Sequence, residues 1–209
     1  MEVRMKKYVV TIARQFGSLG RPIAQRMSEI LGIEYYDRDI VDQAAKKMKL
    51  PVSAVSSEEE TAKSSFFYMK LPLGNNTTEI QDQIFEVQRK IILELADKDS
   101  CIIVGRCADY ILRDTENLTS IYIYAPYEKR LENCIETLHM KPELAKKMIS
   151  EVDKARAAYQ KRYTKYLPED ISHKNILIDS SYLGDFATAE YLAKLIKEKY
   201  DEKTASIII

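Results

Sequence analysis

Residues 8–24 read YVVTIARQFGSLGRPIA, a short apolar run followed by a turn that contains two glycines. The run over 8–13 is flat and rich in β-branched residues, as expected of a strand that is buried on both faces of a parallel sheet. Gly17 and Gly20 punctuate the turn, and Pro22 is a residue that helices accept in their first turn. The stretch therefore predicts a strand, a turn and a helix in direct succession.

Three further runs have the same flat, apolar character, and a fourth is weaker. They cover residues 101–104, 120–125 and 175–178, with 33–36 as the weaker candidate. Helical patterns lie between these runs, and Pro126 and Pro142 each precede a long glycine-free stretch. Strands that alternate with helices predict a doubly wound α/β domain.

One long helix is expected from the spacing of its apolar side chains. Ile80, Ile84, Val87, Ile91 and Leu95 follow one another at intervals of 4, 3, 4 and 4 residues, which places them on one face. Residues 51–78, which precede this helix, are polar and irregular. We expect them to form a mobile excursion at the edge of the sheet rather than a separate domain.

Bulk composition limits the classes of function. Lys plus Arg and Asp plus Glu both number 32, so the formal net charge is zero, which argues against a surface that coats nucleic acid. The three cysteines form no CxxC pair, which favours reduced thiols and a cytoplasmic protein. The apolar run at 8–12 is too short for a signal peptide or a membrane span, so no membrane partner is expected.

The turn between the first strand and the first helix has the position of a phosphate-binding loop. Against the pattern GxxxxGK[ST], Gly20 falls on the second glycine, Arg21 on the lysine, Gln15 on the first glycine and Pro22 on the hydroxyl residue. Backbone N–H groups at a helix N-terminus favour phosphate. The expected phosphate-binding residues are Arg14, Gln15, Phe16, Gly17, Ser18, Leu19, Gly20 and Arg21. A tight turn that binds nothing is the alternative.

Six segments, in chain order and at sensible spacing, resemble the cytidylate kinase-like family, a branch of the nucleoside monophosphate kinases. They are 13–24, YYDRDI at 35–40, 95–112 with VGRCADYIL at its end, IYAP at 123–126 followed by Arg130, DKARA at 153–157 followed by Tyr159 and Tyr163, and IDSS at 178–181. The resemblance covers nearly the whole chain.

This resemblance implies a three-layer, P-loop nucleoside monophosphate kinase-like α/β fold with a five-stranded parallel sheet in a single domain, 1–209. An acceptor-binding flap would occupy about 38–98 and a lid helix about 141–168. The implied reaction is Mg²⁺-dependent transfer of the γ-phosphoryl group of ATP to a nucleoside monophosphate, with CMP as the first choice. Nucleotides are the implied partners, and a homo-oligomer is compatible with the family.

Such transfer depends on cations around the phosphates, and the sequence offers arginines for this role. Arg21, Arg156 and Arg162 are the expected catalytic residues. Residues 141–166 hold eight basic and three acidic residues, an excess of five positive charges that suits a lid over phosphates, although a solvated helix face is the alternative. Arg156 and Arg162 are six residues apart and would point roughly 120° apart on one helix, so an unbroken helix cannot aim both at one phosphate.

For the acceptor, the resemblance implies Asp37, Arg38, Arg106 and Asp109. Asp37 would bind the acceptor or help to position the waters of the metal, and its structural alternative is the N-cap of a helix over 39–47. No side chain is assigned as a direct metal ligand.

Three other functions stay open. Leu19 and Pro22 depart from the loop pattern, so a nucleotide-binding protein without kinase activity is one alternative. A kinase for a non-nucleotide acceptor would share the loop and differ only at the flap. A DNA- or RNA-binding role is least expected, given the zero net charge.

Overall fold

The computed structural model describes residues 6–37, 40, 42, 46–47 and 77–201. Nearly all of the expected excursion at 51–78 and much of the expected flap lie outside the described residues. The flap and the lid therefore stay predictions, although two helices of the expected segments are described: α5 (Thr77–Lys98) and α8 (Pro142–Thr164).

All five expected strands are present, with ends that differ by at most two residues from the apolar runs. They are β1 (Val9–Arg14), β2 (Glu34–Tyr36), β3 (Cys101–Val104), β4 (Leu118–Tyr124) and β5 (Ile176–Asp179). The strands pair in parallel in the order β2-β3-β1-β4-β5. The predicted α/β fold with a five-stranded parallel sheet is confirmed.

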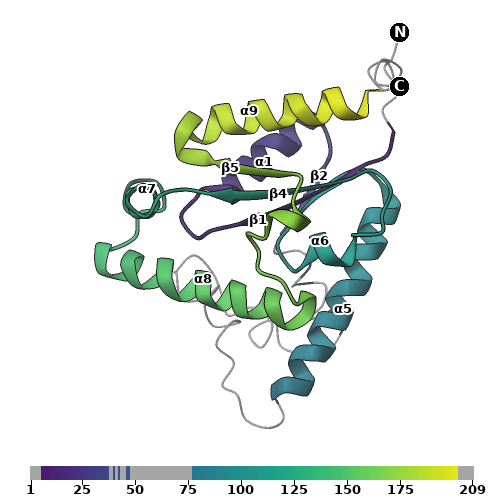
Figure 1. The fold of residues 1–209 in the computed structure, drawn as a ribbon, viewed down its shortest axis with the longest axis horizontal. Coiled ribbons are helices and arrows are strands. Elements are labelled where there is room, and N and C mark those ends of the chain that lie inside the picture. Colours follow the sequence, from purple (N-terminus) through teal and green to yellow (C-terminus); the bar gives the residue numbers. More distant parts are fainter. Residues whose placement is uncertain (1–5, 38–39, 41, 43–45, 48–76, 202–209) are drawn as a thin grey trace.

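Helices cover both faces of this sheet, as Figure 1 shows. One face carries α1 (Gly20–Leu31) and α9 (Ser180–Tyr200), and the other carries α5, α6 (Ala108–Ile111) and α8. Successive side chains of β1 point to opposite faces of the sheet and so enter two separate hydrophobic clusters. Val10 and Ile12 pack with the α1–α9 cluster, whereas Val9 packs with the cluster beneath α5 and α6.

The prolines that predicted helix starts do lie at the starts of helices. Pro22 lies in the first turn of α1, Pro126 is the N-cap of α7 (Tyr127–Glu132), and Pro142 opens α8. Of the apolar stripe of α5, Val87, Ile91 and Leu95 pack in the cluster that includes Cys101 and Ile103 of β3, and Ile91 is fully buried. Among the described helices, none is both long and apolar enough to cross a membrane.

Strand order determines where a ligand can enter. From β1 the chain passes to β2 and β3, which lie toward one edge of the sheet. From β3 it crosses to β4, which lies on the opposite side of β1, so the connections diverge between β3 and β1. In open parallel sheets the crevice beside the carboxyl ends of such strands is the usual ligand site. The residues that follow β1 and β3 therefore lie where a ligand is expected.

Candidate functional site

Charged side chains from three neighbouring strands meet at this crevice. Arg14 is the last residue of β1, Asp37 follows β2, and Gly105 and Arg106 follow β3. Because β2, β3 and β1 are adjacent and parallel, their carboxyl ends bring these residues together.

The loop from Gln15 to Leu19 is held by side chains while several of its amides stay available. The Ser18 hydroxyl donates to the Gln15 carbonyl at 2.9 Å, and the Asn133 side-chain amide donates to the Gly17 carbonyl at 2.9 Å. Among the described residues, none accepts a hydrogen bond from the backbone amides of Gly17 through Arg21. These N–H groups begin α1, whose N-cap residue Leu19 supplies no side-chain cap. A fixed loop with available N–H groups at a helix N-terminus suits a phosphate.

Two glycines of the site make room for Arg14 rather than for a ligand. A Cβ on Gly20 would lie 2.7 Å from the Arg14 Cβ, and a Cβ on Gly105 would overlap the Arg14 guanidinium. The second glycine of the loop pattern therefore serves the packing of an arginine in this chain. The sequence pattern alone did not indicate that role.

Several residues beside the crevice have a left-handed backbone conformation. Gly105, Arg106 and Cys107 have successive φ values of +74°, +58° and +55°, and Leu19 has a φ of +56°. Left-handed conformations cost non-glycine residues about 1 kcal/mol or more each. The turn after β3 thus holds Arg106 in a conformation that the surrounding structure must stabilise.

Asp37 is the carboxylate among Arg14, Arg21 and Arg106, which together with Arg156 form the arginine cluster. Its side chain is only 4% exposed, and its Oδ2 accepts from Arg21 Nε at 2.7 Å and lies 2.5 Å from Arg21 Nη2. Arg14 Nη2 approaches Oδ1 at 3.5 Å. Burial by itself would raise the pKa of Asp37, but the guanidinium groups of Arg14, Arg21 and Arg106 outweigh it and hold that pKa below its ordinary value.

Arg156 reaches the same crevice from α8. Its Nη1 donates to the Arg14 carbonyl at 2.9 Å. Burial, together with the positive charge of Arg14, lowers the pKa of Arg156 to about 9, so the group stays cationic at neutral pH. Two cavities, of about 60 and 240 Å³, lie beside it, and both are lined by Arg14 and Arg156. Arg106 lines the smaller one.

Asp153, one turn before Arg156, bonds α8 to the phosphate loop. Its Oδ1 accepts from the Phe16 amide at 2.8 Å, and its Oδ2 lies 2.5 Å from Arg130 Nη1. Arg130 in turn donates to the Phe16 carbonyl at 3.3 Å. The sequence did not indicate this role of Asp153, which entered the resemblance as part of DKARA at 153–157 and was one of the three acidic residues of 141–166. Its spacing of three from Arg156 was the available signal, because residues three apart share a helix face.

Arg162 lies away from the cluster. It pairs with Asp82 on α5 at 2.7 Å, and the side chains of both partners are at least a third exposed. Tyr163 also donates to Asp82, and its ring stacks on Phe85 of α5 with centroids 3.9 Å apart. The divergence expected from the spacing of Arg156 and Arg162 is therefore present, and the far half of α8 is bonded to α5.

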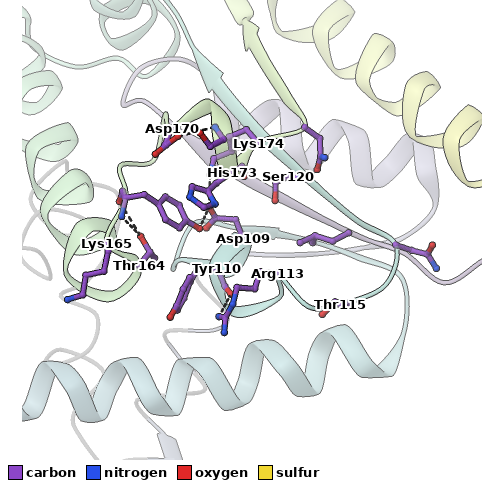
Figure 2. A pocket seen from close by; sticks show the side chains of 15 residues that line it. Asp109, Tyr110, Arg113, Thr115, Ser120, Thr164, Lys165, Asp170, His173 and Lys174 are labelled. Carbon is purple, nitrogen blue, oxygen red and sulfur yellow. Dashed lines mark hydrogen bonds and ion pairs between the residues drawn. The ribbon is translucent and has the colours of Figure 1, made fainter.

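Asp109 belongs to a different network. Its carboxylate accepts from Tyr166 at 3.1 Å and from Gln160 at 3.2 Å, and it forms an ion pair with Lys174, whose side chain is fully buried. Figure 2 shows this part of the structure, with Asp109 and Lys174 labelled. Asp109, Tyr166 and Lys174 border a groove of about 710 Å³ to which the phosphate loop contributes no lining residue. The structure does not bring Asp109 to the cavities beside Arg14 and Arg156.

The remaining site expectations concern Arg38 and the metal. Arg38 lies outside the described residues. Within the described part of the chain, no three His, Cys, Asp or Glu side chains are grouped as a metal site. The Ser18 hydroxyl is engaged by the Gln15 and Ile123 carbonyls, and Pro22 has no hydroxyl. The described backbone amides and guanidinium groups thus fit the phosphates of a nucleotide. The described side chains do not form a direct Mg²⁺ site.

The sequence profile of the cytidylate kinase-like family matches residues 9–182, which is most of the chain. No curated protein sequence matches.

Solved structures share the fold at low sequence identity. An uncharacterised protein from Eubacterium ventriosum is 23% identical with a TM-score of 0.69, covering 91% of this chain and 99% of its own. TT1252 from Thermus thermophilus is 10% identical with a TM-score of 0.59, covering 92% and 97%. Shikimate kinase from Acinetobacter baumannii, in complex with shikimate, is 12% identical with a TM-score of 0.53, covering 93% and 96%. At these identities the likeness shows a common fold.

Proposed function

Because the chain belongs to the cytidylate kinase-like family, we propose that it transfers the γ-phosphoryl group of ATP, with Mg²⁺, to a nucleoside monophosphate, CMP being the first acceptor to test. The proposal joins two features of the crevice, the available amides of the loop and the arginine cluster beside them.

The observation that carries the proposal is the charge balance of the cluster. Among the described residues, the Asp37 carboxylate lies near Arg14, Arg21, Arg106 and Arg156. Asp153, which is paired with Arg130, and Glu169 also border the larger cavity, together with Lys154. Counted with Arg130 and Lys154, these are six cations against three anions among the described residues, which leaves a positive surplus in a partly buried crevice. A phosphate-bearing acceptor would neutralise this surplus, whereas an uncharged acceptor would leave it in place.

Each group then has a distinct part. The amides of Gly17 through Arg21 and the Arg21 guanidinium would hold the phosphates of ATP, which supplies the transferable phosphoryl group and brings Mg²⁺ with it. Arg106 and Arg156 would hold the phosphate of the acceptor beside them. Positioning and charge stabilisation of this kind account for most of the catalysis in phosphoryl transfer.

The other residues expected at the site have more conditional parts in the proposal. Arg162 would act as a second lid cation only after leaving Asp82. Arg38 would contact the acceptor from the flap. Asp109 would act at a distance, by fixing Gln160 of α8 and so the helix that carries Arg156.

The test is a panel of nucleoside monophosphates and phosphate-free polyols, offered with ATP and Mg²⁺. ADP release and mass spectrometry of the acceptor are the readouts. We expect transfer to a pyrimidine monophosphate and a strong loss of it in Arg156→Ala. Arg89→Ala, which removes an exposed arginine of α5, is the matched control. Transfer to an uncharged polyol alone would contradict the assignment of the cluster.

A nucleotide-binding protein without transfer is the second candidate. Two observations favour it: Pro22 provides no hydroxyl, and Arg21 is paired with Asp37 instead of standing free. In that case ATP would bind to the purified protein in calorimetry, and no acceptor of the panel would be phosphorylated.

A further inference from the structure

The bonding of Asp37 gives this residue a function different from acceptor binding. Both of its carboxylate oxygens face protein donors: Oδ2 faces Arg21 and the Tyr35 hydroxyl, which is 3.4 Å away, and Oδ1 faces Arg14. With a side chain only 4% exposed, Asp37 has almost no surface for a ligand. Any effect of Asp37 on a bound anion must therefore pass through the arginines or through its charge.

Asp37 engages one edge of the Arg21 guanidinium. The Nε and Nη2 atoms both meet Oδ2, at 2.7 and 2.5 Å, so Asp37 itself does not occupy the Nη1 side of the fork. The Tyr35 hydroxyl also interacts with the Arg21 guanidinium. The Arg21 side chain is 43% exposed and lies in the first turn of α1, directly after the loop amides. A carboxylate bound along one edge fixes the plane of the guanidinium and hence the direction of its remaining donors.

We propose that Asp37 is a positioning residue with two opposed effects: it orients Arg21 and Arg14 beside the phosphate loop, and its negative charge weakens the binding of the anion that these arginines hold. The catalytic consequence of the orienting half rests on the proposed function, because it is measured as a transfer rate. The charge half does not, because it concerns any polyphosphate bound at the loop.

Both effects follow from elementary electrostatics. A bound phosphate would lie just beyond the guanidinium, on the side away from Asp37, so the two anions would repel each other across a distance of a few ångströms. The repulsion acts in a buried cluster, where salt screens poorly. Without Asp37, however, the guanidinium groups of Arg14, Arg21, Arg106 and Arg156 would repel one another and lose their fixed directions.

The decisive variant is Asp37→Asn, which keeps the size of the side chain and removes its charge. Calorimetric titration with inorganic tripolyphosphate should show binding about tenfold tighter than in the unmodified protein, from the loss of one nearby negative charge. The transfer rate with ATP and acceptor should fall in the same variant. A residue with a merely structural role would weaken both.

Glu34→Gln is the matched control, because it removes the same charge from an exposed position three residues earlier on β2. We expect its tripolyphosphate affinity to change less than about twofold. Unchanged or weaker tripolyphosphate binding in folded Asp37→Asn would overturn the charge half. Tighter binding with no transfer in the unmodified protein would instead refute the proposed kinase function alone.

A measurement on the unmodified protein covers the case in which Asp37→Asn does not fold. In arginine side-chain NMR, the Nε–H signal of Arg21, assigned by its absence in Arg21→Lys, should be protected from solvent exchange by Asp37. We expect this signal to persist at saturating tripolyphosphate, because Asp37 and the anion occupy different edges of the guanidinium. Loss of the protected signal on addition of tripolyphosphate would show that the anion displaces Asp37, and the positioning role would be refuted.

Discussion

Replacing Asp153 with asparagine tests how strongly α8 is held to the phosphate loop. Asp153→Asn keeps an oxygen that can accept from the Phe16 amide, but it removes the negative charge that faces Arg130. The new amide group then directs donor hydrogens at a guanidinium whose side chain is only 11% exposed. The Nε of that arginine is already buried without a partner among the described residues.

The expected loss follows from the exposure of the two partners. Removing one charge of a fully buried ion pair costs about 3–5 kcal/mol. Asp153 is 27% exposed, so water screens part of the interaction, and we expect a loss of about 2 kcal/mol in the free energy of unfolding. In a protein of this size, that loss corresponds to a fall of about 4–8 °C in the unfolding midpoint.

Urea unfolding and thermal unfolding, each followed by circular dichroism, measure this loss. Glu132→Gln is the control, because its pair with Lys129 is more than half exposed on both sides and should contribute less than about 0.5 kcal/mol. The loss of stability in Asp153→Asn should persist in 1 M salt, where the Debye length is about 3 Å and exposed ion pairs are largely screened. If both variants lose the same small amount, Asp153 does not hold α8 to the loop and the reasoning is wrong.

Four further outcomes are expected. Arg21→Ala should lower the transfer rate about 10³-fold while weakening ATP binding much less, and Arg21→Lys should not restore the rate because lysine lacks the planar fork; steady-state kinetics and ATP titration check both. Gly105→Ala should destabilise the protein by about 1–2 kcal/mol in urea unfolding, since its φ of +74° disfavours a side chain, and should also reduce transfer. Arg162→Ala should change stability by less than about 1 kcal/mol, because its ion pair is exposed; a transfer loss as large as that of Arg21→Ala would instead place it at the substrate. The pKa of Asp37 is below its ordinary value, so its stabilisation relative to Asp37→Asn should be complete above about pH 4 and disappear as the pH falls through the folded-state pKa, which acid titrations of unfolding free energy would show.

The sheet could be predicted because its strands are recognisable locally. Buried parallel strands are flat apolar runs, and four of them stood out in the sequence. The short edge strand β2 was the weaker candidate, since it has only three residues and none of them is fully buried. Prolines marked helix starts because a missing N–H costs nothing in the first turn of a helix.

The partners of the charged side chains could not be predicted in the same way. Asp153 bonds to an amide 137 residues away, and Arg162 pairs with a residue 80 positions earlier. Such contacts depend on how α8 lies across the sheet, which no local spacing encodes. Asp109 illustrates the limit, because the resemblance implied an acceptor contact and the fold surrounds its carboxylate with Lys174 and Tyr166.

The packing of Arg14 between two glycines also restricts how this chain can change by mutation. A side chain at position 105 meets the Arg14 guanidinium, so the effect of that substitution depends on residue 14, whereas a side chain at position 20 meets the Arg14 Cβ, which every residue except glycine would retain. Alanine at position 105 would retain its backbone strain but lose its steric clash in a chain where Arg14 has first become a small residue. Positions 14 and 105 are therefore epistatic, and their substitutions should not be additive in the free energy of unfolding.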